Sequence, residues 1–260
     1  MSEPKLIHLR GKPVAGGALP LICTPLVGRT RDELVAELAE VLPKKPDLIE
    51  WRVDFFEGIV DTALVIDTAR AIKAGAGEIP ILFTRRSTQE GGEEIQLVEA
   101  DVVRLYEAVC AARCADMIDY EMCNEAANFA CLRLASSRND ILMIASYHNF
   151  QSTPDATTLV DKFAQAERLG GDVAKVAVMP QGPQDVLTLL GATHLASQSV
   201  SLPLISMSMG ACGSLSRMIG WVYGSTVTFA VGKGRSAPGQ VPIDELRTVL
   251  ATVRRAVLGA

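Results

Sequence analysis

A lysine within an apolar run is the residue whose position most suggests chemistry. Lys175 is the single charge in the run rich in valine and alanine that follows Gly170 and Gly171, and we expect it near the end of a buried β-strand. A buried ammonium is costly unless it is paired or neutral, and a neutral amine attacks ketones and aldehydes. Lys175 is therefore a candidate for Schiff-base formation. The alternative is a lysine that reaches solvent or pairs with a carboxylate such as Asp172.

A histidine lies at the end of the preceding predicted strand. His148 follows the apolar run 141–147, whereas His8 lies in the N-terminal segment and His194 in a predicted helix. We interpret His8 and His194 as structural or solvated. His148 and Lys175 are expected to be neighbours, because they end consecutive strands. An imidazole beside an amine nucleophile can shuttle the protons of carbinolamine formation, dehydration and hydrolysis.

Charged side chains follow two earlier strands. Glu50 and Arg52 are two residues apart, so both point to one face of their strand, where they form either an ion pair or part of a substrate site. Arg86 comes directly after the third strand, and Glu90 lies in a loop with two glycines, which lets backbone approach a ligand closely. Arg86 and Glu90 are candidates for function. We interpret Arg85 as a solvated charge.

Two later segments add candidates. Arg217 lies in the predicted helix 213–223, and we expect it near the start of this helix, facing the end of the sheet that holds Lys175. The loop 232–240 (GKGRSAPGQ) is rich in glycine and small polar residues. Loops after the last strands of a barrel often bind phosphate, although the glycines of this loop do not match a P-loop.

Short apolar runs alternate with helical patterns along the chain. The runs are rich in isoleucine, valine, leucine and alanine, as expected for strands buried on both faces. We predict eight strands, at 20–25, 47–54, 80–84, 116–121, 141–147, 172–179, 203–208 and 226–231. One helix begins at the capping box 30–33, and the others span 60–73, 96–113, 124–136, 157–169, 183–197, 213–223 and 243–257.

Eight strand-then-helix units without a linker predict a (β/α)8 barrel, in which chemistry lies at the carboxyl ends of the strands. We predict one domain over residues 1–260, with residues 5–17 forming a short hairpin that closes the lower end of the barrel. A doubly wound open sheet is the alternative. The first strand, however, is not followed by the GxGxxG turn that would favour it.

Composition restricts the cellular context and the kinds of partner. Basic residues (25) are outnumbered by acidic ones (30) and form no stripe, so we do not expect nucleic acid as a partner. We expect no membrane span and no signal peptide, because no apolar run is long enough, and we predict a cytoplasmic protein. The six cysteines form no CxxC pair, which favours reduced, buried thiols over a zinc site.

Taken together, six segments resemble the type I 3-dehydroquinate dehydratases, the Schiff-base class of the shikimate or quinate pathway. These segments are IEWRVD, RSTQEGGE, SYHNF, VAKVAVMP, SRMIGWVYGS and SAPGQ. They occur in the order of the family, and the resemblance covers nearly the whole chain. It implies a barrel enzyme that converts 3-dehydroquinate, a small molecule, to 3-dehydroshikimate and water. It also implies a homodimer that uses no metal or cofactor.

The resemblance implies catalytic roles for three residues. Lys175 would form the imine with the ketone of the substrate. His148 would transfer protons during imine formation and elimination, and Glu90 would help to orient it. The chemistry is reasonable, because a protonated imine withdraws electrons and so acidifies the α-proton that dehydration of a β-hydroxy ketone must remove.

The resemblance also implies a set of residues that bind the substrate. They are Glu50, Arg52 and Arg86 for its hydroxyls, Arg217 for its carboxylate, and Ser236 and Gln240 to close over it. A guanidinium suits the carboxylate because it can donate two parallel hydrogen bonds. Two positive charges depart from the family pattern, Arg85 before Arg86 and Arg235 ahead of SAPGQ.

Two other functions use some of the same residues. A class I aldolase or a transaldolase-like lyase would also use Lys175 but would cleave a carbon–carbon bond, often in a phosphorylated sugar. A ligand sensor would keep a binding site for a quinate-like molecule without turning it over, and the presence of both Lys175 and His148 counts against this reading.

Overall fold

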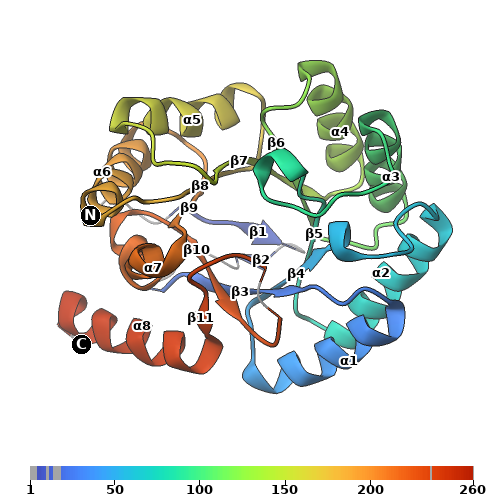
Figure 1. Ribbon diagram of the computed structural model, residues 1–260, viewed down its shortest axis with the longest axis horizontal. Coiled ribbons are helices and arrows are strands. Elements are labelled where there is room, and N and C mark those ends of the chain that lie inside the picture. Colours follow the sequence, from blue (N-terminus) through green and yellow to red (C-terminus); the bar gives the residue numbers. More distant parts are fainter. Residues whose placement is uncertain (1–4, 10–11, 14–18, 235, 260) are drawn as a thin grey trace.

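The strands of the protein form a closed ring that helices surround on the outside (Figure 1). This computed structural model describes residues 5–9, 12–13, 19–234 and 236–259. Within them, the sheet has the order β11-β10-β3-β4-β5-β6-β7-β8-β9, and its strands pair in parallel. The strands are β3 (Leu21–Leu26), β4 (Leu48–Arg52), β5 (Ile81–Thr84), β6 (Met117–Glu121), β7 (Leu142–Asn149), β8 (Val173–Val178), β9 (Leu204–Ser208), β10 (Val227–Val231) and β11 (Val241–Pro242).

The spatial order of β3 to β9 follows the chain without a switch point, which excludes the doubly wound alternative. The ring closes because β10, the eighth barrel strand, lies between β3 and β9. Strand β10 pairs with β3 along three residue pairs, and the other seam is closed by a parallel bridge between Leu204 and Ser225, where Thr226 N donates to Leu204 O at 2.7 Å. The predicted (β/α)8 barrel is confirmed.

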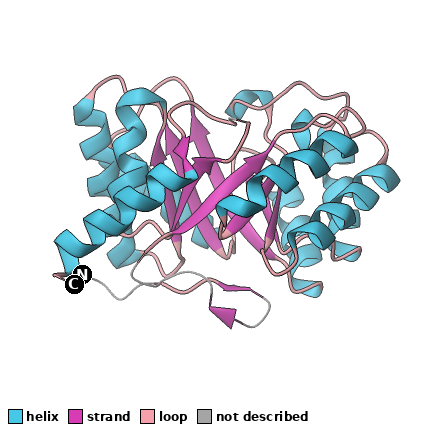
Figure 2. Ribbon diagram, turned by 90° about the horizontal axis from the view of Figure 1, so that it is seen from below, coloured by secondary structure: helices cyan, strands magenta, loops and turns pink. Residues whose placement is uncertain are grey.

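A helix follows each barrel strand and covers its outer face (Figure 2). The helices are α1 (Arg31–Val41), α2 (Thr62–Ala76), α3 (Glu99–Ala111), α4 (Ala126–Arg138), α5 (Ala156–Arg168), α6 (Pro183–Ser199), α7 (Gly210–Ile219) and α8 (Ile243–Leu258). The capping box at the start of α1 is present, because the Thr30 hydroxyl accepts Glu33 N and the Glu33 carboxylate accepts Arg29 N.

The predicted position of Arg217 near the start of its helix is wrong. Helix α7 begins three residues earlier than predicted, at Gly210, and Arg217 lies in its last turn. The early start depends on small residues. Gly210 has φ of +69°, and a Cβ at Gly213 would lie 2.4 Å from the backbone carbon of Ser208. After α7 the chain tightens into a 3-10 turn (Gly220–Tyr223), which explains why the sequence pattern extends to residue 223.

Strand alternation divides the barrel interior into an apolar lower part and a polar upper part. The lower part consists of inward-facing residues near the start of each strand: Cys23, Leu48, Leu82, Met117, Ile144, Val173, Ile205 and Val227. Two residues further along their strands, Glu50, Thr84, Asp119, Ser146 and Lys175 take the same inward orientation. The apolar part therefore forms a dry base beneath the charged groups.

Aromatic side chains on the outer face of the barrel support the strands that carry these charges. Trp51, Phe83, Tyr106, Tyr120 and Phe129 form a row of ring contacts with centroids 5.1–6.0 Å apart. The hydroxyl of Tyr106 donates to Asp119 O at 2.8 Å and accepts Arg85 N at 2.7 Å. Through Tyr106, the row thus fixes the backbone at the ends of β5 and β6, whose inward-facing side chains are polar.

The N-terminal hairpin lies below the barrel, as predicted (Figure 2). Its strands are β1 (His8–Leu9) and β2 (Lys12–Pro13), which pair antiparallel. Ile7 and Leu9 are almost fully buried and belong to the same apolar cluster as the base of the barrel. Parts of the predicted hairpin, residues 10–11 and 14–17, lie outside the described residues.

The cysteines agree only partly with the prediction of buried thiols. All six are free, and Cys23, Cys110 and Cys114 are buried, but Cys123 and Cys212 are exposed and Cys131 is half-buried. Cys123 and Cys212 lie in the turn after β6 and at the start of α7, beyond the apolar positions of these elements. Among the described helices, none combines the length and apolar character needed to cross a membrane.

Leu9→Ala is expected to lower the free energy of unfolding by about 2 kcal/mol, at the low end of the range for buried leucines, because the hairpin can relax around the cavity. Leu6→Ala is the matched control, since Leu6 belongs to the same segment but is 49% exposed, and its effect should stay within about 0.5 kcal/mol. Urea unfolding measures both. Equal effects of the two substitutions on the free energy of unfolding would show that the hairpin does not seal the base of the barrel.

Candidate active site

A cavity opens at the carboxyl ends of the strands. All nine residues that the sequence analysis proposed for catalysis or substrate binding line this cavity: Glu50, Arg52, Arg86, Glu90, His148, Lys175, Arg217, Ser236 and Gln240. They come from four different strands or strand ends, from α7 and from the loop after β10. Their assembly follows from the parallel strand order, which places every carboxyl end on one side of the barrel.

Lys175 is buried at the bottom of this cavity, with 3% of its surface exposed. Its Nζ lies 2.7 Å from Asp119 Oδ2 and 3.8 Å from Glu50 Oε1. Of the alternative considered from the sequence, pairing with a carboxylate is confirmed, but the partner is Asp119 and not Asp172, and the lysine does not reach solvent. Asp172 directly precedes β8 at the opposite end of the strand, where it pairs with Arg133 at 2.6 Å.

Asp119 connects the lysine to a buried arginine. Its Oδ1 accepts Arg86 Nη2 at 2.6 Å and Ser146 Oγ at 2.6 Å. Arg86 also donates to Glu121 at 3.1 Å and to Glu90 at 3.4 Å. Burial opposes the charge of Arg86, but the surrounding carboxylates outweigh it and raise the pKa of its guanidinium above the ordinary value. Arg86 also donates to Ser146 Oγ at 3.0 Å and is therefore a permanent charge that binds four protein side chains.

His148 is held by Glu90. Its Nδ1 lies 2.7 Å from Glu90 Oε2, and the same oxygen accepts the backbone N–H of His148 at 3.1 Å. No described residue hydrogen-bonds Nε2. Burial, together with the positive charges of Arg86 and Lys175, lowers the pKa of His148 well below its ordinary value, so the imidazole is neutral at physiological pH. Burial raises the pKa of Glu90 to about 8, although Arg86 opposes this shift.

Glu50 and Arg52 do not form an ion pair with each other. Glu50 accepts the hydroxyl of Thr84 at 2.9 Å and faces Lys175. Arg52 donates two hydrogen bonds to Asp54, at 2.9 and 2.7 Å, and its Nη1 donates to Ser236 O at 3.3 Å. Of the two alternatives considered from the sequence, an ion pair between Glu50 and Arg52 is therefore excluded, because Asp54 supplies the partner of the guanidinium.

The loop after β10 covers the cavity from one side. Ser236 N donates to Gln240 Oε1 at 3.1 Å, and Gln240 Nε2 donates to Ser236 Oγ at 3.2 Å, so these residues tie the loop to itself. Gly234 N donates to Glu37 at 3.3 Å. The loop thus directs this amide toward a carboxylate, which does not favour the phosphate cradle considered from the sequence. Arg235 lies outside the described residues.

Arg217 is the one buried arginine of the described cavity lining that has no carboxylate partner. Its Nη2 donates to Pro238 O at 3.2 Å, its Nη1 has long contacts to Phe229 O and Met207 Sδ, and its Nε has no partner. Burial lowers the pKa of its guanidinium to about 10, which leaves it charged at neutral pH. An unpaired buried cation of this kind favours an anionic ligand.

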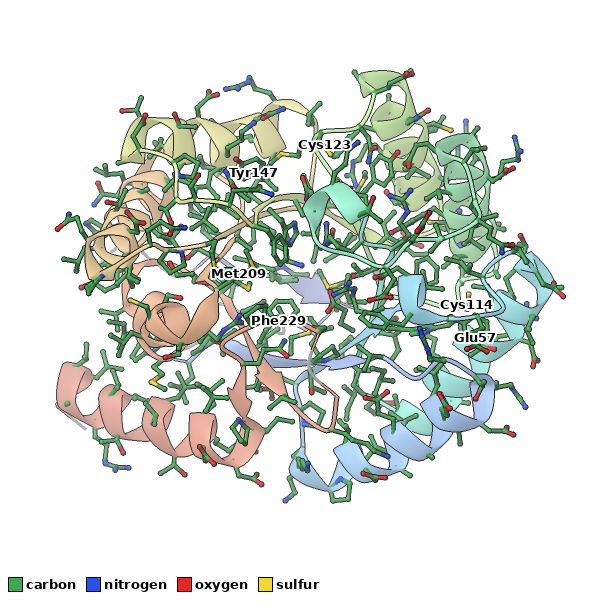
Figure 3. The ribbon with its side chains drawn as sticks, viewed as in Figure 1. Glu57, Cys114, Cys123, Tyr147, Met209 and Phe229 are labelled. Carbon is green, nitrogen blue, oxygen red and sulfur yellow. The ribbon has the colours of Figure 1, made fainter. Side chains whose placement is uncertain are left out.

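The remaining lining of the cavity is apolar. Met209 and Phe229 lie near the middle of the barrel in Figure 3, and the other members are Gly91, Phe150, Ala177, Met207 and Ala237. The ring of Phe229 lies 4.8 Å from Lys175 Nζ. The amine thus has carboxylates on one side and an apolar wall on the other.

Sequence reasoning missed Asp54, Asp119, Glu121 and Ser146. Asp119 and Glu121 are two residues apart in MIDYE, the same spacing that identified Glu50 and Arg52, so this signal was present. Asp54 and Ser146 had no comparable signal. The interpretation of Arg85 as solvated is wrong, because Arg85 is buried and pairs with Glu99 on α3 at 2.7 Å, where the chain turns outward after β5.

Among the described residues, one group has three potential metal ligands close together, Glu90, Glu121 and Cys123. The guanidinium of Arg86 already donates to both carboxylates of this group. A cation there would compete with a permanent positive charge, so the donor set does not fit a metal centre.

Comparisons with known proteins agree with this geometry. The chain matches the family described as Type I 3-dehydroquinase over residues 22–256. A relative from Albidiferax ferrireducens, named 3-dehydroquinate dehydratase, is 60% identical over 99% of this chain and 97% of its own length. One from Aromatoleum aromaticum with the same name is 49% identical over the full length of both chains.

Solved structures give the same result. The 3-dehydroquinate dehydratase of Geobacillus kaustophilus superimposes with a TM-score of 0.95, at 47% identity over 98% of both chains. A type I enzyme of that name from Clostridium difficile, solved with covalent modified comenic acid, has a TM-score of 0.93, at 32% identity over 98% of this chain and all of that one. This chain belongs to the type I 3-dehydroquinase family.

Proposed function

We propose that the chain dehydrates 3-dehydroquinate to 3-dehydroshikimate through an imine on Lys175. The enzyme is a dehydratase, and so a lyase, of the type I family. The observation that carries the mechanism is one cavity that holds a buried amine, a neutral imidazole and a buried guanidinium without a carboxylate partner. These are the groups that a ketone, a proton transfer and a carboxylate require.

In the first step His148 Nε2 takes one proton from the Lys175 ammonium, and the neutral Nζ then attacks the ketone carbon. The nitrogen of the ammonium begins with three protons, and two of them leave with the carbonyl oxygen as water. The product is a protonated imine with the same single positive charge. His148 moves these protons, because its Nε2 has no hydrogen-bond partner among the described residues and it lines the same cavity.

In the second step His148 Nε2 removes the α-proton, and the electrons of the broken C–H bond move into the iminium to form an enamine. Glu90, whose Oε2 lies 2.7 Å from Nδ1, orients the ring for this transfer. The proton returns to the β-hydroxyl, which leaves as water while the enamine reverts to an iminium, and water hydrolyses the iminium.

The substrate is bound by groups around this centre. Arg217 binds the carboxylate, and the polar residues Glu50, Arg52, Arg86, Ser236 and Gln240 face its hydroxyls. Arg217 gives up little on binding, since the structure offers it long contacts and carbonyl oxygens only. Because Arg86 is already engaged with four side chains, it also holds Asp119 and Glu90 in place.

We further propose that residues 1–260 act as one catalytic domain in a cytoplasmic homodimer of the shikimate or quinate pathway. The support is the name shared by the relatives, which match over nearly their whole length. The imine itself supplies the electron sink, so this chemistry requires no metal or cofactor.

Borohydride reduction with 3-dehydroquinate, followed by mass spectrometry, tests the proposal. We expect a stable mass increase on the peptide that contains Lys175, and neither adduct nor turnover in Lys175→Met. Lys73→Met is the matched control, because Lys73 also pairs with an aspartate, Asp116, but lies outside the cavity. Turnover without a trapped adduct would exclude the imine. Trapping of a sugar phosphate in preference would favour an aldolase, and binding without turnover would favour a ligand sensor.

Arg217→Gln is expected to raise KM for 3-dehydroquinate about 10- to 150-fold, the value of a charged hydrogen-bonded contact, with a smaller effect on kcat. Arg85→Gln is the control, since Arg85 is buried but lies outside this cavity. Steady-state kinetics of both variants measure the difference. An unchanged KM in Arg217→Gln would contradict the proposal that Arg217 binds the carboxylate of the substrate.

The imidazole of His148 is expected to stay neutral at pH 6.5, where an unperturbed histidine is half protonated, because its pKa is lowered. Its function as a base is then lost only below this pH. Nitrogen-15 NMR of histidine-labelled protein measures the ring directly, with His8 and His194, which lie outside the cavity, as reference signals. A ring that is mainly protonated at pH 6.5 would contradict the assignment of His148 as the base.

A further inference from the structure

We propose that Asp119 is the counter-ion of the iminium that forms on Lys175. The inference rests on the imine proposed above and adds the group that keeps this imine protonated. Asp119 is fully buried on β6, and its Oδ2 lies 2.7 Å from Lys175 Nζ, the atom that becomes the iminium nitrogen.

The two oxygens of Asp119 have separate partners. Oδ1 accepts Arg86 Nη2 and Ser146 Oγ, both at 2.6 Å, whereas Lys175 is the only described partner of Oδ2. The backbone of Asp119 is fixed too, because its carbonyl accepts the hydroxyl of Tyr106. One oxygen thus anchors the carboxylate, and the other points at the reacting nitrogen.

Glu50 is the other carboxylate near this nitrogen, and it is less suited to the role. Its nearest oxygen lies 3.8 Å from Lys175 Nζ, and that oxygen accepts the hydroxyl of Thr84 at 2.9 Å. The Coulomb attraction between a carboxylate and a cation rises as their separation falls. Asp119, which is closer and makes a direct hydrogen bond, therefore carries the larger part of the stabilisation.

Asp119 can keep its charge throughout the reaction. Burial opposes its ionised form, but the positive charges of Arg86 and Lys175 outweigh burial and hold the pKa of Asp119 well below the ordinary value. The ammonium and the iminium carry the same charge on the same atom. The ion pair is therefore present before the ketone arrives and stays in place when the carbon–nitrogen double bond forms, without rearrangement of the carboxylate.

Other groups around Lys175 influence the same equilibrium. The titratable or charged side chains that face it are Cys23 from β3, Glu50 from β4, Arg86 after β5, Asp119 from β6 and His148 from β7. On β9 and β10 the facing side chains are Met207 and Phe229, which do not titrate. Burial raises the pKa of Cys23 well above its ordinary value, so its thiol stays neutral. Arg86 and a protonated His148 would both disfavour an iminium, which leaves the carboxylates to stabilise it.

The test measures how the reduction rate of the adduct depends on pH. The adduct is formed with 3-dehydroquinate at neutral pH, shifted to a series of higher pH values and reduced with cyanoborohydride, which reacts with the protonated imine. Mass spectrometry follows the trapped protein. In Asp119→Asn the alkaline limb of this profile should move down by about 1–3 pH units, the usual effect of an opposite charge at this distance.

Asp116→Asn is the matched control. Asp116 directly precedes β6 and pairs with Lys73 at the lower end of the barrel, so this variant loses an ion pair of the same type away from the cavity. Its alkaline limb should coincide with that of the wild type. If Asp119→Asn forms the adduct but keeps the wild-type limb, Asp119 is not the counter-ion. If the wild type forms no adduct, the imine and the proposed function fail instead.

A measurement on the wild type alone covers the case in which Asp119→Asn does not fold. The imine that the same ketone forms with butylamine in water provides the reference, because it has no counter-ion. Nitrogen-15 NMR of the lysine-labelled adduct should show an iminium that stays protonated at least about one pH unit above this reference. An adduct that loses its proton at or below the reference pH would overturn the proposal.

Discussion

Charge compensation in the dry upper half of the barrel is the constraint on which the site depends. Lys175 and Arg86 are buried within reach of one carboxylate, Asp119, and neither cation would be tolerated there alone. Arg86 in turn orders Glu90, and Glu90 orders His148. The nucleophile and the base are thus held by one connected set of ion pairs, which explains how inward-facing charges can occupy positions that apolar residues take lower in the same strands.

The rest of the fold supplies what these ion pairs need. The apolar base of the barrel and the hairpin beneath it keep water away from one side of the charges. The aromatic row outside β4, β5 and β6 fixes the backbone from which Arg85 and Asp119 project. Inward-facing and outward-facing side chains alternate along each strand. A shift of one residue in the strand register would therefore turn an inward-facing charge toward the surrounding helices. The register of the strand pairing therefore determines which charged side chains reach the site.

The barrel and the lining residues at strand ends could be predicted, because buried parallel strands read as continuous apolar runs and polar residues at their ends stand out. Ser236 and Gln240, in the loop after β10, were indicated only by the resemblance to the type I family. Partners could not be predicted in the same way. Whether Arg52 pairs with Glu50 or with Asp54 depends on side-chain directions after the strand ends, and the burial of Arg85 depends on the packing of α3. The start of α7 depended on close backbone contacts of Gly213, which leave no periodic pattern.

The short strand β11 has a consequence for the loop that covers the cavity. It pairs with β10 at Ala230 and Val231, so the loop 232–240 leaves and re-enters the structure at adjacent points of one sheet edge. The entropy loss from bringing the loop ends together therefore occurs when the barrel folds and not when a ligand binds. The loop that covers the cavity is therefore largely preorganised. The affinity for a ligand is not reduced by the cost of ordering this loop.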